Sequence, residues 1–309
     1  MLESAGECCV QGEILAKPVT EQRGCDTMRN ILDSLKIYVC PKCKGPLTLR
    51  DAALECPACQ VAYPIGDGIP DFIAEDLAQS THSVLRGVKL IDWLAPIYES
   101  RLWYPVVLNL YGGWHSITLE QLVHLISTIV GGTDGLILDV ACGPGTYGRR
   151  VATKTNQVYG IDISLGMLRQ GMVYVERDHL DNVHFARAQV ESLPFQDALF
   201  DAAICSGSLH LFADTVRALR EIGRAMKGGA PLAVMTFTGG DKGILRFRRI
   251  REHVERDHGA HIFEIQELEG YLTEAGFEDF RPQTYGSVLV FSARKQRNSS
   301  LTCGSPAVG

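Results

Sequence analysis

The segment LILDVACGPGTYG, residues 136–148, decides the fold. An apolar run leads into a glycine-rich turn, and a helical pattern follows that turn. Glycines let the backbone approach a ligand closely, and the start of a helix offers free N–H groups. A second apolar run, VYGID at residues 158–162, ends in Asp162. A doubly wound fold places an acid at that point for the hydroxyls of a ribose.

Outward from this segment, strand-like and helix-like patterns alternate. Such alternation predicts an α/β fold with a parallel, doubly wound sheet. The helix before the glycine turn has a capping-box pattern at Thr118 and Gln121 and ends at Gly131. We predict strands at 135–141, 157–163, 183–188, 201–206, 230–237 and 287–293, and helices at 146–154, 164–178, 214–227 and 265–276.

The glycines alone do not identify the ligand. Residues 143–148 also fit the GxGxxG pattern of dinucleotide-binding enzymes. Asp139, four residues before the first glycine, is more informative. A carboxylate at that position would repel a pyrophosphate and attract an ammonium group, which favours an amino-acid-bearing cofactor.

The combination of DVACGPGTYG with GIDIS resembles the first two motifs of class I S-adenosylmethionine-dependent methyltransferases. The resemblance continues through residues 188–195, 200–210 and 219–229, and covers about residues 131–293. It implies a Rossmann-like, doubly wound seven-stranded sheet with helices on both faces. It also implies S-adenosylmethionine as cofactor and S-adenosylhomocysteine as product.

The same resemblance assigns the cofactor contacts. Asp162 would bind the ribose hydroxyls, and Tyr98 would lie over the methionine end. Gln189 stands where the family often has Asp, and its carbonyl oxygen can still accept a hydrogen bond from the adenine amino group. The full predicted set is Tyr98, Asp139, Cys142, Gly143, Gly145, Asp162, Ile163, Met167, Gln189, Val190 and Ser206.

Two CxxC pairs lie near the N-terminal end, Cys40–Cys43 and Cys56–Cys59. Each pair places two sulfurs on one turn, and four thiolates form a closed, tetrahedral zinc site of the structural type. The twelve residues between the pairs suit a short hairpin. The module is too small for a large core, so metal binding would supply much of its folding free energy. A redox dithiol is the alternative.

His210 follows the predicted fourth strand, where the acceptor faces the methyl group in the resembling family. A histidine there is a candidate general base, and a packing histidine is the alternative. Residues 242–256 are rich in arginine and lie where this family inserts substrate-binding elements. This segment is either a patch for an acidic substrate or RNA, or a solvated helix with internal ion pairs.

The 309 residues allow one α/β domain plus a small module, and the net charge of −6 argues against a nucleic-acid-binding protein. We expect no membrane span and no signal peptide, and the paired cysteines favour a reducing cytoplasm. The expected divisions are a disordered extension (1–30), a zinc-binding module (31–74), a helical cover (75–130), the methyltransferase domain (131–295) and a disordered tail (296–309).

Three functions follow from these patterns. The first is a methyltransferase that modifies a small organic molecule, with O-methylation of a secondary-metabolite hydroxyl or enol as the specific expectation. The second is a ribosomal RNA methyltransferase of the guanine-N1 type. The third is a partner-binding zinc ribbon on a non-catalytic Rossmann-like domain. The substrate, the acceptor atom and the oligomeric state are not fixed by the sequence.

Overall fold

The computed structural model describes residues 35–73, 98–100, 102–114, 116–258 and 260–297. The chain divides into two units, residues 1–36 and 37–309, and the second contains every element discussed below. The predicted extension and most of the predicted tail lie outside the described residues, as does the first part of the predicted helical cover.

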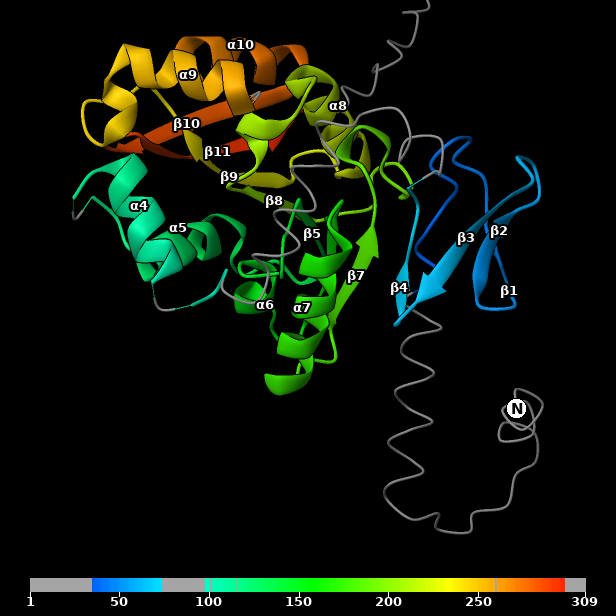
Figure 1. The fold of residues 1–309 in the computed structure, drawn as a ribbon. Helices are drawn as coiled ribbons and strands as arrows, with labels where there is room; N and C mark the ends of the chain where they lie inside the picture. The colour runs from blue at the N-terminus through cyan, green and yellow to red at the C-terminus, as the bar shows by residue number, and fades with distance from the viewer. Residues whose placement is uncertain (1–34, 74–97, 101, 115, 259, 298–309) are drawn as a thin grey trace, which may run out of the picture. The chain divides into compact units, whose positions relative to one another are not determined.

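The larger domain is built on a seven-stranded mixed sheet (Figure 1). Its order is β10-β11-β9-β8-β5-β6-β7, so the order reverses between β5 and β8. Strands β5 to β9 pair in parallel, and β10 and β11 run antiparallel to the rest. The bounds are β5 (Gly135–Val140), β6 (Asn156–Asp162), β7 (Val183–Arg187), β8 (Ala202–Ser206), β9 (Pro231–Phe237), β10 (Phe277–Tyr285) and β11 (Val288–Lys295).

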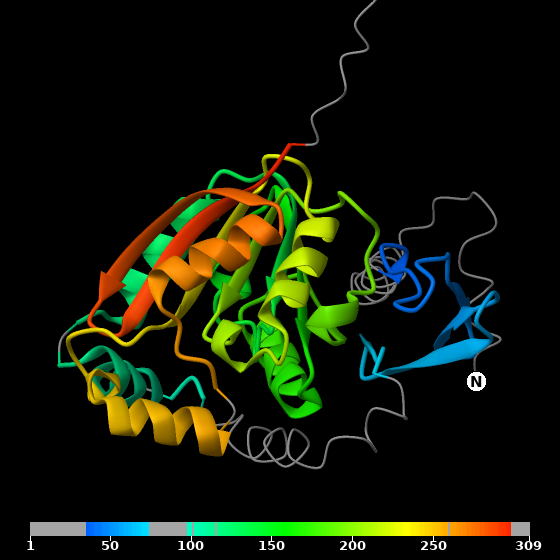
Figure 2. The same cartoon turned by 90° about the horizontal axis from the view of Figure 1, so that it is seen from above.

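Helices cover both faces of this sheet, as Figure 2 shows: the orange α10 and yellow-green α8 lie on one face and the blue-green helices on the other. Helices such as α5, α7, α8 and α10 pack their apolar stripe inward and leave their polar face outside. The helices are α4 (Trp103–Gly112), α5 (Leu119–Val130), α6 (Gly148–Val151), α7 (Leu165–Arg177), α8 (Thr215–Ala225), α9 (Arg248–His258) and α10 (Ile265–Glu274).

Local sequence signals explain where several helices begin. The Thr118 side chain accepts from the Gln121 N–H and Gln121 accepts from the Thr118 N–H, which confirms the predicted capping box of α5. Ser164 and Asp214 cap α7 and α8 in the same way with one side-chain bond each. The central strand β8 is buried except at its last residue, as expected for a parallel strand covered on both faces.

One packing feature connects the glycine turn to the sheet. A Cβ added at Gly145, Gly160 or Gly171 would come within 3.0 Å of the Phe185 ring. Phe185 lies on β7 and is 3% exposed. These three glycines therefore make room for one aromatic ring between α7, the turn and the sheet.

Two elements differ from the predicted pattern. The sheet is mixed, because β10 and β11 form an antiparallel pair at one edge. Strand β10 was not predicted, and α9 was predicted only as one of two alternatives for residues 242–256. Most residues of β10 are exposed and α9 is polar on nearly every side, so neither shows an apolar period.

The small module contains a four-stranded antiparallel sheet in the order β1-β2-β3-β4. Strands β1 (Thr48–Arg50) and β2 (Ala53–Cys56) form the predicted hairpin, and β3 (Val61–Gly66) and β4 (Ile69–Pro70) follow. Asp51 and Ala52 form the turn with φ values of 44° and 60°. Two such residues are typical of the tight turns that match the twist of paired strands.

The module packs on the larger domain through backbone and side-chain contacts. The N–H of Val39 donates to the Pro194 carbonyl at 2.9 Å, and that of Phe72 donates to the Arg187 carbonyl at 2.7 Å. Lys44 forms an ion pair with Glu221 at 2.7 Å. Tyr38 adds an aromatic contact, with its ring centroid 5.4 Å from that of Phe195. The module is therefore attached to the segment that follows β7.

Candidate cofactor site and cysteine cluster

The two glycines of the turn have different roles. Gly143 has a φ of 55°, and a Cβ added there would meet only the Tyr98 ring, at 4.0 Å. Gly145 has a φ of 74°, and a Cβ there would collide with Phe185. Gly143 thus leaves open space next to the backbone, as a ligand-facing residue must, whereas Gly145 permits close packing.

Asp162 ends β6 beside the turn. One carboxylate oxygen accepts the Gly143 N–H at 2.9 Å, and the other accepts the Ser164 N–H at 2.8 Å. A carboxylate accepts hydrogen bonds from hydroxyl groups as well as from N–H groups, which is the chemistry that the predicted ribose contact needs. Asp162 therefore lies beside the turn and holds it in place, and its contact with the ribose hydroxyls stays a prediction.

Asp139 ends the apolar part of β5 and is 2% exposed. Its carboxylate accepts the Gly148 N–H at 2.9 Å. Burial raises its pKa to about 7, because removal from water disfavours the charged form. Among the described residues it has no ion pair. A buried acid of this kind fits a cationic ligand group, and an ammonium group would meet that requirement.

Tyr98 lies over the turn, and the residue after it anchors the segment. The Glu99 carboxylate accepts from the Thr146 hydroxyl and from Arg149. Burial, followed by the nearby Asp162 charge, raises the pKa of Tyr98 to about 12, so its hydroxyl remains a donor. This placement is consistent with the predicted contact between Tyr98 and the methionine end of the cofactor.

Arg149 connects three parts of the site. It is 7% exposed, and each guanidinium nitrogen has a separate partner. Its Nε donates to the Pro144 carbonyl at 3.2 Å, its Nη1 pairs with Asp178 at 2.6 Å and its Nη2 pairs with Glu99. Sequence reasoning missed this residue, since nothing in the glycine pattern identifies its acidic partners.

The residues predicted to surround the adenine come after β6 and after β7 in the chain. Met167 is 2% exposed and Val190 is 7% exposed, so both pack into the domain. Gln189 precedes a 3₁₀ turn and is half-buried, as is Ile163. Arg187 donates to the Ile163 carbonyl at 2.9 Å and pairs with Asp71 of the small module at 3.0 Å. The Arg187 side chain therefore links Asp71 of the module to the Ile163 carbonyl on this side of the site.

Cys142 and Ser206 lie on opposite sides of the point where the strand order reverses. Cys142 is 8% exposed, and its thiol is directed at its neighbour's carbonyl, Gly143 O, at 3.4 Å. Burial raises the thiol pKa well above its usual value, so it remains neutral. Ser206 ends β8, and its hydroxyl oxygen is buried.

His210 lies in a 3₁₀ turn just after β8. Its Nδ1 is 3.4 Å from the Thr236 hydroxyl, and its ring makes an edge contact with Phe237. Burial lowers its pKa to about 4, so the imidazole is neutral at physiological pH. A neutral imidazole can accept a hydrogen bond or a proton, although at this pKa it is a weak base.

The four predicted zinc ligands come together. The sulfurs of Cys40, Cys43, Cys56 and Cys59 all lie within 4.8 Å of one another. Sulfurs bound tetrahedrally at the usual zinc–sulfur distance would be about 3.8 Å apart. The Cys43–Cys56 and Cys40–Cys59 sulfur distances are 3.6 and 3.9 Å. This geometry and the all-thiol donor set fit a structural zinc ion.

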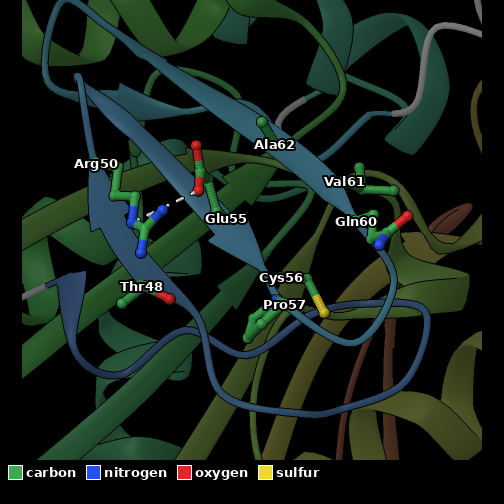
Figure 3. Close-up of a pocket in the computed structure, with 8 residues that line it drawn as sticks. All are labelled: Thr48, Arg50, Glu55, Cys56, Pro57, Gln60, Val61 and Ala62. Carbon is green, nitrogen blue, oxygen red and sulfur yellow. Dashed lines mark ion pairs between the residues drawn. The ribbon is translucent and has the colours of Figure 1, made fainter.

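A hollow lies beside this cluster on the module, as Figure 3 shows. Arg50 of β1 and Glu55 of β2 form an ion pair across it at 3.9 Å, and Cys56 lies at its edge. None of the predicted cofactor residues lines it. The hollow is thus separate from the glycine turn.

The arginine-rich segment forms α9 with ion pairs of its own. Arg248 pairs with Glu252 at 3.4 Å, and Arg251 pairs with Glu264 at 3.5 Å. On the module, Lys44 is engaged with Glu221. These contacts favour the reading as a solvated helix over a patch for RNA.

Two family models match the chain in the places that the motifs indicated. Residues 137–229 match the model described as "Methyltransferase domain", and residues 33–68 match that described as "Trm112p-like protein". These matches confirm the prediction of a class I S-adenosylmethionine-dependent methyltransferase with an N-terminal zinc-ribbon module. The predicted fold class, a Rossmann-like sheet with a small zinc-binding module, is confirmed as well.

Similar proteins agree with this assignment. The uncharacterized methyltransferase At2g41040, chloroplastic, of Arabidopsis thaliana is 24% identical over 87% of this chain and 81% of its own length. The demethylmenaquinone methyltransferase of Lactiplantibacillus plantarum is 26% identical over 63% of this chain and 89% of its own. Both are called methyltransferases, in agreement with the predicted enzyme class.

A solved structure with the same fold is the [4+2]-cyclase SpnF, with a TM-score of 0.55 and 23% identity over 69% of this chain and 96% of its own. This likeness shows the fold alone. No helix within the described ranges is long and apolar enough to cross a bilayer. The cytoplasmic location remains a prediction.

Proposed function

We propose that the chain transfers a methyl group from S-adenosylmethionine to a hydroxyl or enol oxygen of a small organic acceptor. The observation that carries the proposal is the buried Asp139 carboxyl at the end of β5, in the strand that leads into the open Gly143 turn, since such an acid fits a cofactor with a cationic end. The name of the demethylmenaquinone enzyme supports a small ring compound as acceptor. The acidic net charge disfavours RNA.

The cofactor, when bound, supplies a sulfonium that makes its methyl group electrophilic. Asp139 would hold the ammonium end and Asp162 the ribose hydroxyls, with Gln189, Val190, Ile163 and Met167 around the adenine. Tyr98 would exclude water from the methionine end. Positioning of this kind can account for roughly 7–11 kcal/mol of a barrier.

We propose that His210 takes the proton from the substrate hydroxyl that receives the methyl group. A base with a pKa of about 4 is weak, so proton transfer to it is less unfavourable from an enol or phenol-type hydroxyl than from an aliphatic alcohol. This property favours an acidic acceptor over an aliphatic alcohol. If the acceptor arrives already ionised, His210 serves as a hydrogen-bonding group and not as a base.

Cys40, Cys43, Cys56 and Cys59 would hold one structural zinc ion, since four protein ligands leave no open position for a substrate. The module packs against the segment after β7, so its proposed role is to support that side of the site. The alternative is a module that binds a protein partner, which the match to Trm112p-like proteins supports.

The test is label transfer from methyl-labelled S-adenosylmethionine into a cell extract that is then separated into organic, RNA and protein fractions. We expect label in the organic fraction, and O-methyl product by mass spectrometry. Label confined to RNA would contradict the proposal. Binding of S-adenosylhomocysteine without transfer to any fraction would favour the partner-binding alternative.

A further inference from the structure

The last strand of the zinc-binding module runs into the edge of the larger sheet. Ile69 of β4 is 1% exposed and belongs to the apolar core cluster of the larger domain. Asp71, the residue after β4, forms an isolated parallel bridge with Arg187, the last residue of the edge strand β7. The end of the module is therefore continuous with the fold of the domain.

The Arg187 side chain connects this junction to the cofactor side of the domain. Its Nη1 pairs with the Asp71 carboxylate at 3.0 Å, and both side chains are 24% exposed. Its Nε donates to the Ile163 carbonyl at 2.9 Å. A guanidinium is planar and rigid, so it holds two partners in one fixed arrangement. One side chain thus bonds at the same time to the module and to the residue that follows Asp162.

The bond to Ile163 acts on the carboxylate that is predicted to bind the ribose. The Ile163 carbonyl and the Ser164 N–H belong to the same planar peptide unit. That N–H donates to the Asp162 carboxylate at 2.8 Å, and the other carboxylate oxygen holds the Gly143 N–H at 2.9 Å. Because Arg187 fixes the carbonyl of this peptide, it also fixes the N–H that orients Asp162.

A series of contacts leads from the cysteine cluster to the same arginine. The Cys40 sulfur lies 3.4 Å from the Tyr63 hydroxyl, and the Tyr63 ring lies 5.1 Å from the Phe72 ring. Phe72 is 6% exposed, and its N–H donates to the Arg187 carbonyl at 2.7 Å. Metal binding and folding are coupled in modules of this size, so the position of Asp71 and Phe72 depends on an intact cluster.

We propose that Arg187 is a positioning residue through which the zinc-binding module sets the affinity for the cofactor. A module whose cysteines hold zinc keeps Asp71 in place, and Arg187 passes this constraint to the peptide that orients Asp162. The inference rests on the proposed function and adds a regulation to it. Loss of zinc weakens binding of the adenosine part of the cofactor, although no zinc ligand is a predicted cofactor contact.

The test uses two variants that break the connection from either side. Asp71→Asn and Arg187→Met leave the cysteines and the predicted cofactor contacts in place. Asp67→Asn is the matched control, because Asp67 of the module pairs with Arg169 of α7 at 2.9 Å, an exposed pair that joins the same two parts without Arg187. The probes are S-adenosylhomocysteine and 5′-methylthioadenosine, which lacks the amino-acid end, and both affinities are measured by calorimetry.

We expect Asp71→Asn to weaken binding of both probes about three- to fivefold and Arg187→Met to weaken it about tenfold, since a half-buried, charge-assisted contact is lost. The factors should be equal for the two probes, because the probes share the adenosine part. In the Arg187→Met background, Asp71→Asn should add no further loss. Asp67→Asn should change neither affinity. Zinc content should equal that of the wild-type protein in all of these variants.

The zinc-free variant Cys40→Ser with Cys43→Ser tests the metal side of the coupling. Its affinity for both probes should fall by about the same factor as that of Arg187→Met. Addition of Arg187→Met to the zinc-free variant should cause no further loss, because the module no longer constrains the arginine.

Three results would overturn the inference. The first is that Asp71→Asn and Arg187→Met bind both probes as tightly as Asp67→Asn does. The second is a loss in Asp71→Asn that persists in the Arg187→Met background, which would show that it does not pass through the arginine. The third is unchanged affinity in the zinc-free variant. Failure of the wild-type protein to bind either probe would instead refute the proposed function, so the two failures are distinguishable.

Discussion

The small module and the larger domain reach stability by different means. In the module, all three residues of β1 are exposed, and two of the buried side chains are the cysteines Cys40 and Cys56. In the domain, four of the five residues of β8 are buried, and helices cover both faces of the sheet. The domain can fold by burying apolar surface, whereas the module depends on its metal and on its neighbour.

The largest effect should come from loss of the cysteine ligands. Cys40→Ser with Cys43→Ser should reduce bound zinc from about one per chain to none, because two thiolates cannot complete a tetrahedral site. Hydrogen exchange should then lose protection in residues 48–70 and retain it in residues 135–162. Cys205→Ala, in the core of β8, is the control and should keep its zinc. Retained zinc in the double variant would refute the four-cysteine site.

The second effect concerns the ligand site of the domain. Asp162→Ala should weaken S-adenosylhomocysteine binding by about 10- to 100-fold, since hydrogen bonds to a charged group contribute about 1.5–3 kcal/mol. The measurement is calorimetry, with zinc content unchanged. Asp201→Ala is the control: Asp201 accepts the Leu136 N–H at the other end of the sheet and should affect Tm only. Unchanged affinity in Asp162→Ala would remove the ribose assignment.

A third effect is a pH dependence specific to the domain. The raised pKa of Asp139 means that the free protein carries a protonated carboxyl below about pH 7. Binding of an ammonium group favours the ionised form, so cofactor affinity should rise with pH from 5 to 7, by up to about tenfold per unit. The free energy of unfolding of the free protein should change in the opposite direction. The raised pKa of Asp139 stabilises the fold at low pH, and this contribution is lost as pH rises through 7. Asp139→Asn should abolish both trends, and persistence of either in that variant would contradict the assignment.

The smallest effect tests the junction between the two regions. Lys44→Met removes a half-buried ion pair with Glu221 and a hydrogen bond to the Leu193 carbonyl. The expected loss is about 0.5–1 kcal/mol in the unfolding of the module, measured by hydrogen exchange. Arg220→Ala removes an exposed pair with Glu274 and should change nothing measurable. An equal loss of module stability in Lys44→Met and Arg220→Ala would show that the Lys44–Glu221 ion pair does not stabilise the junction.

The sequence predicted the parts of the molecule whose signals are local. Strands β5 and β6, the glycine turn and the two CxxC pairs are each contained in a short segment, and the structure places them as expected. Strand β10 escaped prediction because it is an exposed edge strand that carries Asp279 and Pro282, residues that are rare in strands.

Long-range contacts were not predictable in the same way. Glu99 and Arg149 are fifty residues apart, and only the fold brings them together over the turn. Tyr147 is an aromatic residue like many in a core, and only the structure shows that it is buried next to Ser206 at the end of β8. A single sequence carries no signal for either feature, because each depends on how distant segments pack.

The ring of Phe185 has a consequence for which sequences this fold can accept. It occupies the space that a methyl group would need at Gly145, Gly160 and Gly171. Residue 185 and the three glycines therefore restrict one another. Gly160 and Gly171 have ordinary backbone angles, but a Cβ at Gly160 would also lie 2.8 Å from the Cys142 sulfur. A smaller side chain at 185 would therefore make room for alanine at 171 and not at 160. Gly145 would remain restricted by its φ of 74°. We expect relatives with a small residue at 185 to vary at 171 and to keep glycine at 145 and, where residue 142 is cysteine, at 160.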